Sequence, residues 1–204
     1  SLVAFDGTTI SGREASTRDA VLVVESDPSG APPALAGWDF NDASPDLRLE
    51  NATTQEGVKG NGLGFDGRSR ASWKSENDLE FTRTSLTVSA WVKTTEDGTI
   101  FSQANPEGEW IPDGKTFFVR EGRLCYDVGW VGAVCGDTNI ADGQWHHVAF
   151  TWNPKTQLIR LWVDGDEDGE AELSPEGPVE GLVIRFGYTA SNFPASSWFT
   201  GTMD

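Results

Sequence analysis

Residues 143–165 constrain the fold of this chain more than any other segment. Within it, residues 145–152 (WHHVAFTW) and 158–163 (LIRLWV) each alternate between apolar and mixed positions, with a short polar turn between them. Alternation with a period of two is typical of a β-strand that buries one face. The second run ends at Asp164-Gly165, a dipeptide that favours a tight hairpin turn. The segment therefore predicts consecutive antiparallel strands that cover a core with one face.

Two histidines stand near the start of the first run, and the same alternation separates them. His146 has the parity of the core-facing positions, whereas His147 faces the mixed side of the strand. Neighbouring residues of a strand cannot chelate one ion together, and no nucleophile accompanies them, so neither a metal pair nor a catalytic pair is expected. The mixed face also carries Arg160 and Trp162, and we regard it as a candidate recognition surface.

The rest of the chain has the same character. Short apolar runs alternate with turn residues, 23 of the 204 residues are glycine, and no long apolar stripe of helical period occurs. Further strands are expected near residues 37–41, 62–66, 70–74, 86–93, 98–102, 116–120, 123–128, 132–136 and 182–187. No run approaches the roughly 18 apolar residues of a membrane span. The pattern predicts an all-β, antiparallel β-sandwich.

Five segments, in this order, resemble the laminin G-like modules of the concanavalin A-like lectin/glucanase group. They are residues 38–42 (WDFND), 64–67 (GFDG), 86–93 (LTVSAWVK), 145–165 and 199–204 (FTGTMD). The resemblance covers roughly residues 35 to 204 and implies a jelly roll. It also implies a further strand after residue 204. Either the chain is cut from a larger protein, which we expect, or an N-terminal strand fills that place.

The first 34 residues are expected to lie outside this module. Residues 2–5 and 20–24 are strand-like, and residues 26–33 (SDPSGAPP) have the composition of a linker. We therefore predict an N-terminal segment over 1–34, the tail of a preceding domain or an added hairpin. A sandwich domain over 35–204 follows it, tethered to other domains of a longer chain.

The formal charge of −17 excludes some partners. Nucleic-acid binding depends on Lys and Arg at the phosphates, and this chain has 15 such residues against 32 Asp and Glu. The same charge disfavours polyanions such as heavily sulfated glycans, unless a metal or a local basic patch intervenes. No nucleic-acid partner is expected.

Two cysteines flank a hairpin apex. If the hairpin is symmetric about Trp130, Cys125 and Cys135 lie opposite each other on adjacent strands and project to the same face. This arrangement predicts a cross-strand disulfide and hence an exported protein, secreted or held at the cell envelope. The alternative is a pair of reduced cysteines in a cytosolic protein.

The nine tryptophans are candidates for stacking on sugar rings. Trp110, Trp130 and Trp198 fall in expected loops or at a hairpin apex, where burial does not readily explain them. Trp91 and Trp162 lie on mixed strand faces, where the alternative is cover by a crossing loop. The candidate ligand-binding residues are Trp91, Trp110, Trp130, Arg160, Trp162 and Trp198.

Calcium is possible at two places. Residues 164–170 (DGDEDGE) place carboxylates at alternate positions, as at the start of a calcium loop, but the twelfth position is Pro175 rather than Glu, and a solvated turn is favoured. The resemblance implies a second site at the sheet edge, with a structural calcium held by the matching residues Asp39, Asn41, Asp42 and Asp204.

Enzymes of this broad fold cleave glycans with two carboxylates on one strand face. The sequence has no such pair inside an apolar strand, so catalysis is not expected. The favoured function is a non-catalytic carbohydrate-binding module that holds a polysaccharide or glycan through stacking tryptophans. The alternatives are an extracellular protein-interaction or adhesion module and, less favoured, a glycan-cleaving enzyme domain.

Overall fold

A computed structural model describes residues 20–24, 34–38, 40, 47–73, 81–177 and 179–204. Sixteen strands and no helix are assigned in these ranges, and every strand pair is antiparallel. The described part of the chain thus contains no helix that is long and apolar enough to cross a membrane. The predicted all-β sandwich is confirmed.

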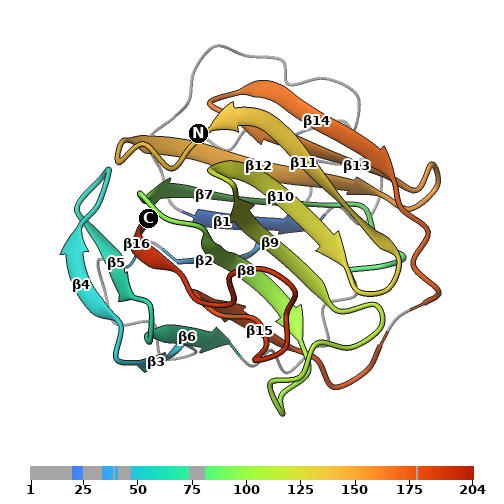
Figure 1. The fold of residues 1–204 in the computed structure, drawn as a ribbon, viewed down its shortest axis with the longest axis horizontal. Helices are drawn as coiled ribbons and strands as arrows, with labels where there is room; N and C mark the ends of the chain where they lie inside the picture. Colours follow the sequence, from blue (N-terminus) through green and yellow to red (C-terminus); the bar gives the residue numbers. More distant parts are fainter. Residues whose placement is uncertain (1–19, 25–33, 39, 41–46, 74–80, 178) are drawn as a thin grey trace.

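The strands form two sheets (Figure 1). The order of the first is β14 (Asp166–Glu172), β13 (Leu158–Val163), β12 (Trp145–Asn153), β7 (Leu86–Lys93), β16 (Thr200–Met203), β5 (Asn61–Asp66) and β4 (Thr53–Glu56). Two further strands join this nine-stranded sheet, since β1 (Ala20–Val24) pairs with β7 and with β2 (Ala34–Trp38). The order of the seven-stranded sheet is β11 (Gly132–Asn139), β10 (Arg123–Val128), β9 (Lys115–Arg120), β8 (Gly98–Ala104), β15 (Val183–Phe186), β6 (Arg70–Trp73) and β3 (Leu47–Glu50).

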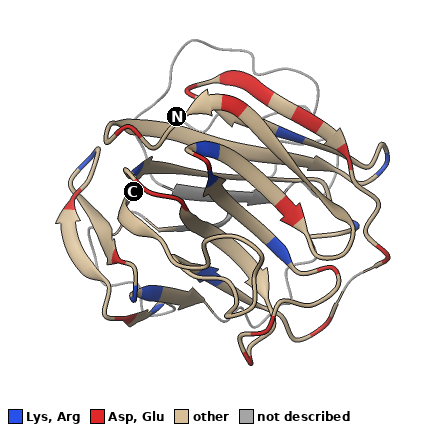
Figure 2. Ribbon diagram, viewed as in Figure 1, with Lys and Arg blue, Asp and Glu red and all other residues tan. Residues whose placement is uncertain are grey.

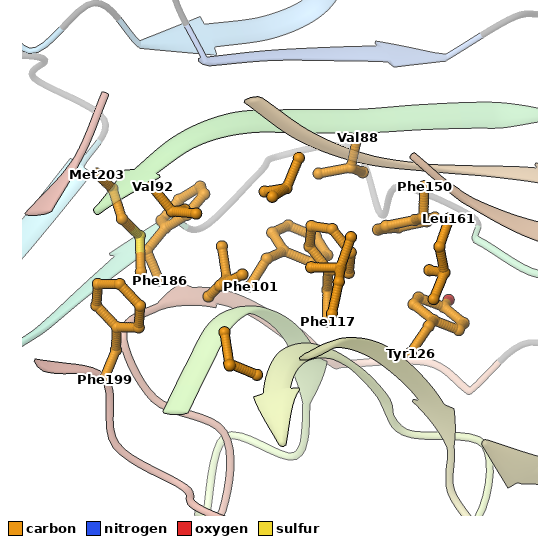
Figure 3. Packing of buried hydrophobic residues seen from close by; sticks show 14 of the residues in the cluster. Val88, Val92, Phe101, Phe117, Tyr126, Phe150, Leu161, Phe186, Phe199 and Met203 are labelled. Carbon is orange, nitrogen blue, oxygen red and sulfur yellow. The ribbon is translucent and has the colours of Figure 1, made fainter. Parts of the chain in front are cut away.

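The main core fills the space between the sheets, as Figure 3 shows. Val148, Phe150 and Leu161, which the alternation predicted to face inward, are fully buried. Phe150 meets two rings from the opposite sheet, with centroid distances of 5.1 Å to Phe117 and 4.5 Å to Tyr126. These contacts explain why Val148, Phe150 and Leu161 are apolar, since all three belong to the core that contains these aromatic rings.

Both predicted hairpins are present. Phe150 lies opposite Leu161 in the β12–β13 pair, and the following turn has positive φ angles at Asp164 (53°) and Gly165 (94°), as a tight hairpin turn requires. In the β10–β11 pair, Cys125 lies opposite Cys135, and the two form a disulfide with a Cα–Cα distance of 4.1 Å. The disulfide prediction is confirmed.

Some segments differ from the sequence-based expectation. The acidic run after Gly165 is not a turn, because residues 166–172 form the edge strand β14. Both faces of this strand carry acidic side chains, so its sequence shows no alternation between apolar and polar residues. Strands β3 and β4 were not predicted, and their residues are mostly exposed. The first predicted strand lies at 34–38 rather than 37–41.

Strands from the two ends of the chain share one edge of β7. Strand β16, from the segment 199–204, pairs with β7 at Val92 and Lys93. Strand β1 pairs with the other end of β7, from Leu86 to Val88. Residues 20–24 therefore belong to the nine-stranded sheet. The predicted division of the chain at residue 34 stays a prediction.

Candidate functional site

Two loops cover the outer face of the seven-stranded sheet. They span residues 105–114 and 188–198, and they bring Trp110 and Phe193 onto Phe118, which points outward from β9. The Phe193 centroid lies 4.9 Å from that of Trp110 and 5.0 Å from that of Phe118. Trp110 is only 7% exposed, so the expectation of an exposed aromatic at this position is wrong. The loops form a second, smaller core in place of an open sheet face.

The loop over 188–198 closes on itself through an aromatic pair. Tyr188 and Trp198 form an antiparallel backbone bridge, and their ring centroids lie 4.1 Å apart. Tyr188 is buried, whereas Trp198 keeps 36% of its surface exposed. The bridge therefore presents one side of a rigidly backed tryptophan to solvent, which is the arrangement that stacking on a ligand requires.

Arginines surround this aromatic pair. The guanidinium carbons of Arg70 and Arg185 lie 5.5 and 5.6 Å from the centroid of the Tyr188 ring, within the range of cation–π contacts. Nε and Nη2 of Arg70 both donate to Oε2 of Glu50, at 3.0 and 2.7 Å. The hydrogen bond from Arg70 lowers the pKa of Glu50 despite partial burial, so this carboxylate is ionised at neutral pH.

Arg185 fixes the loops in place. It is 4% exposed, and its guanidinium donates to the carbonyls of Asn105, Pro106 and Thr189. Burial lowers its pKa, with a contribution from the nearby charge of Arg70. The side chain thus joins the 105–114 loop to the 188–198 loop and stays a fixed positive charge beneath Tyr188.

Figure 2 shows that charge is distributed unevenly over the molecule. Basic residues gather around β3, β6 and β15, and acidic residues are dense on β14. We define the arginine patch as Arg48, Arg68, Arg70 and Arg185. Arg70 and Arg185 lie over the Tyr188 ring, Arg48 approaches Glu50, and Arg68 follows Gly67, which bonds to the backbone of Phe199. Sequence reasoning singled out Trp198 but missed Tyr188 and the arginines. The signal was available, since Ala71 and Trp73 face the core and Arg70 must then face outward.

The outer face of the nine-stranded sheet brings the other predicted residues together. His147 lies opposite Trp91 in the β12–β7 pair, and Ala149 lies opposite Trp162 in the β12–β13 pair. Nε1 of Trp162 donates to Oγ1 of Thr151 at 3.3 Å. Trp91 and Trp162 are half-buried rather than open, and Trp91 makes an edge contact with the His147 ring at 5.3 Å.

Arg160 also lies on this face, but acidic residues of β14 engage it. Its Nε lies 3.3 Å from a carboxylate oxygen of Glu167 and 3.2 Å from one of Glu170. The face therefore offers aromatic surface, whereas its one predicted cation is already shared by two carboxylates. As a ligand surface it is poorer than the exposed side of Trp198.

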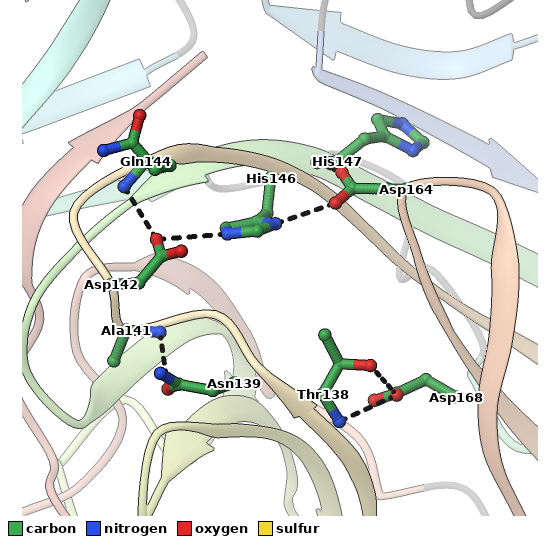
Figure 4. Close-up of polar contacts among 9 residues, drawn as sticks. All are labelled: Thr138, Asn139, Ala141, Asp142, Gln144, His146, His147, Asp164 and Asp168. Atoms are coloured by element: carbon green, nitrogen blue, oxygen red, sulfur yellow. Dashed lines mark hydrogen bonds and ion pairs between the residues drawn. The ribbon is translucent and has the colours of Figure 1, made fainter.

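His146 connects three segments at the rim of the sandwich (Figure 4). Its Nδ1 lies 2.8 Å from Oδ2 of Asp164, and its Nε2 lies 3.2 Å from Oδ1 of Asp142. Partial burial alone would lower the pKa of His146, but the two carboxylates together raise it above its ordinary value. His147 points away from His146 in Figure 4, and burial lowers its pKa. As expected from parity, the histidines do not converge.

Asp204 is the only predicted calcium ligand that the structure describes; Asp39, Asn41 and Asp42 lie outside the described residues. Asp204 is buried, and its Oδ2 accepts a hydrogen bond from the backbone N–H of Lys59 at 3.0 Å. This contact ties the β4–β5 turn to the end of β16. Among the described residues no three acidic, His or Cys side chains converge on a point that suits a metal ion. The calcium site stays a prediction.

The acidic run of β14 makes a structural contact instead. Oδ1 of Asp168 accepts from the backbone N–H and the hydroxyl of Thr138, at 3.0 and 2.5 Å (Figure 4). This contact joins the edge strands of the two sheets. Trp130, at the apex of the β10–β11 hairpin, is 70% exposed as predicted, with a positive φ of 61°.

The fold is shared with domains of an arabinanase, a laminin and a sialidase. The structure is similar to domain 4 of AbnA, an extracellular arabinanase of Geobacillus stearothermophilus solved with arabinotriose (TM-score 0.57, 16% identity, 77% of this chain and 80% of that one). It is also similar to domains LG4-5 of the mouse laminin α1 chain (0.52, 18%, 74% and 40%). A third similar structure is the CBM40 of a Ruminococcus gnavus sialidase with α2,3 sialyllactose (0.51, 12%, 76% and 88%).

No curated protein matches the chain by sequence. A family model described as the concanavalin A-like lectin/glucanases superfamily, of laminin G type, matches residues 66–204. That match spans more than half of the chain and includes most strands of both sheets. The chain therefore belongs to the concanavalin A-like lectin/glucanases superfamily.

Proposed function

We propose that this chain is a non-catalytic carbohydrate-binding module of an exported protein, and that it binds glycan at Trp198. One observation carries the proposal. Trp198 is a large exposed ring that is backed by Tyr188, and Arg70, hydrogen-bonded to Glu50, lies over the same Tyr188 ring. An aromatic face can stack on the apolar face of a sugar, while an ionised pair beside it can bond to hydroxyl groups.

Rigidity favours this site over the other exposed tryptophan. The Trp198 backbone is bridged to Tyr188, and Arg185 ties the same loop to residues 105 and 106. A site that is already ordered loses little conformational entropy when a ligand binds. Trp130 has no aromatic neighbour among the described residues and projects from a hairpin apex, so it offers a single ring without polar partners that converge on it.

Two further observations are consistent with the proposal. The Cys125–Cys135 disulfide is of the kind that persists in oxidising compartments, which supports export. Two of the similar structures were solved with bound saccharides, arabinotriose and sialyllactose. Adhesion to a protein partner is the competing function, since the fold is shared with laminin domains.

A glycan array tests the proposal, with Trp198→Ala and Trp130→Ala as matched variants that each remove one exposed indole. We expect binding to at least one glycan family, and at least about tenfold weaker binding for Trp198→Ala, which corresponds to about 1.4 kcal/mol. Trp130→Ala should bind as the parent chain does. Thermal melts of both variants confirm that the fold is intact. Binding to no glycan on the array would refute the proposal in favour of adhesion.

A further inference from the structure

We propose that the ligand at Trp198 is an anionic saccharide, one that carries carboxylate groups, and that the arginine patch recognises its charge. This inference rests on the proposed function and names the ligand class for the same site. Its basis is the contrast between the patch and the remainder of the chain. The formal net charge is −17, yet Arg70 and Arg185 both lie within cation–π range of the Tyr188 ring, and Arg48 approaches Glu50, the ion-pair partner of Arg70.

Three arginines of the patch act electrostatically on the same carboxylate. The charges of Arg48, Arg70 and Arg185 all act on Glu50 and help to lower its pKa, so these three guanidinium groups lie near one carboxylate. Arg68 enters from the turn after β5. The N–H of Gly67 donates to the carbonyl of Phe199 at 3.0 Å, which places this turn beside the Trp198 backbone.

Carboxylates of the protein neutralise only part of this charge. Glu50 engages Arg70 at 2.7 Å and Arg48 more weakly at 3.6 Å, and the Arg48 side chain is 80% exposed. Oδ1 of Asp66 accepts hydrogen bonds from the Ser69 hydroxyl and from the backbone N–H of Arg68. This carboxylate therefore has hydrogen-bond donors other than the guanidinium groups of the patch. Among the described residues, Glu50 is the carboxylate that forms ion pairs with arginines of the patch, so positive charge is in excess around the Tyr188 ring.

The densest acidic run of the chain lies far from this local charge. Its densest run is on β14, which contacts β11 at the far edge of the seven-stranded sheet from β3. Six strand spacings of about 4.8 Å place the two edges roughly 29 Å apart. That separation exceeds the Debye length of about 8 Å at physiological salt, so the charge of β14 is largely screened at the patch.

The arginines of the patch differ in burial, and we expect them to have different roles in binding. Arg185 is buried and bonded to backbone carbonyls, and it contributes a fixed positive field without contacting ligand. Arg48 and Arg68 are exposed and are the groups available to pair with a ligand carboxylate. Arg70 lies between them, held against Glu50 and Tyr188. A uronic or sialic acid residue would place its ring on Trp198 and its carboxylate toward Arg48 and Arg68.

Affinity electrophoresis tests this inference with four acidic polysaccharides: polygalacturonate, alginate, hyaluronan and polysialic acid. Each is paired with its carboxyl-reduced, neutral form. We expect retardation of the chain by at least one acidic polymer and at least tenfold weaker binding to its reduced partner. The double variant Arg48→Gln/Arg68→Gln should bind about tenfold more weakly, because each exposed ion pair contributes modestly. Added salt should weaken binding of the parent chain.

The control is Arg123→Gln/Lys155→Gln, which removes the same total charge from the half-buried Arg123 and the exposed Lys155, both outside the patch, and should bind as the parent does. Equal retardation by an acidic polymer and its reduced form would overturn the inference, while the proposed function would stand. Equal loss of binding in both double variants would also overturn it, since net charge rather than the patch would then set affinity. No binding to any of these polymers, together with an empty glycan array, would refute the proposed function itself.

Discussion

Removal of the Cys125–Cys135 disulfide should destabilise the chain by an amount that follows from its short loop. The two cysteines are 10 residues apart in sequence. Closing a loop of this size removes about 9 cal/mol/K of entropy from the unfolded chain, or about 2.7 kcal/mol at 25 °C. We therefore expect Cys125→Ala/Cys135→Ala to lower the free energy of unfolding by about that amount. For a chain of this size the midpoint temperature should fall by about 5–10 °C.

Urea titrations of the double variant and of the reduced parent chain separate the effect of the cross-link on stability from the effect of lost packing. Cys125 is buried in the second core beside Phe118, so the alanine variant also loses a packed sulfur. The reduced parent chain keeps both sulfur atoms and isolates the entropic effect. Its stability should fall by nearly the same amount, and the double variant should not respond to reductant. A loss below about 1 kcal/mol for the reduced parent would refute the reasoning, because the unfolded hairpin would then be constrained without the bond.

Two further predictions concern His146 and a comparison of Trp110 with Trp130. Because its pKa is raised in the folded state, the contribution of His146 to stability is full below its unfolded pKa of about 6.5 and is lost as pH rises through the raised value. His146→Gln should therefore cost about 1 kcal/mol or less at pH 5.5 and less at pH 8.5, measured by urea titration; a larger cost at pH 8.5 would contradict the contacts with Asp142 and Asp164. Trp110→Ala should destabilise the fold by about 3–5 kcal/mol, whereas Trp130→Ala should change stability by about 0.5 kcal/mol or less; equal thermal melts for the two variants would show that the second core contributes nothing.

Sequence reasoning succeeded where one side of a strand enters the core and the other does not. The faces of residues 145–152 and 158–163 could be predicted because Val148, Phe150, Ile159, Leu161 and Val163 all enter the main core. The Cys125–Cys135 pairing followed from symmetry about Trp130, since hairpin register is set by the turn. Both are local properties, fixed by residues close together in sequence.

Prediction failed where long-range packing decides the outcome. Trp110 looks like an exposed loop residue until the 188–198 loop lays Phe193 against it. Strand β14 looks like a turn, because its acidic side chains lie on a sheet edge where neither face is apolar. The site itself was predicted in part: Trp198 was named from its loop position, but Arg70, which lies over the ring of Tyr188, is 118 residues away from Tyr188 in the sequence.

The buried side chain of Arg185 has a consequence for how this surface can vary. Its guanidinium holds carbonyls from both loops at once, at Asn105, Pro106 and Thr189. The loops are therefore not independent modules: a change in the length of one would displace the carbonyls that position the other. The shape of this surface can be redesigned only by exchanging both loops together, with Arg185 kept as the common anchor.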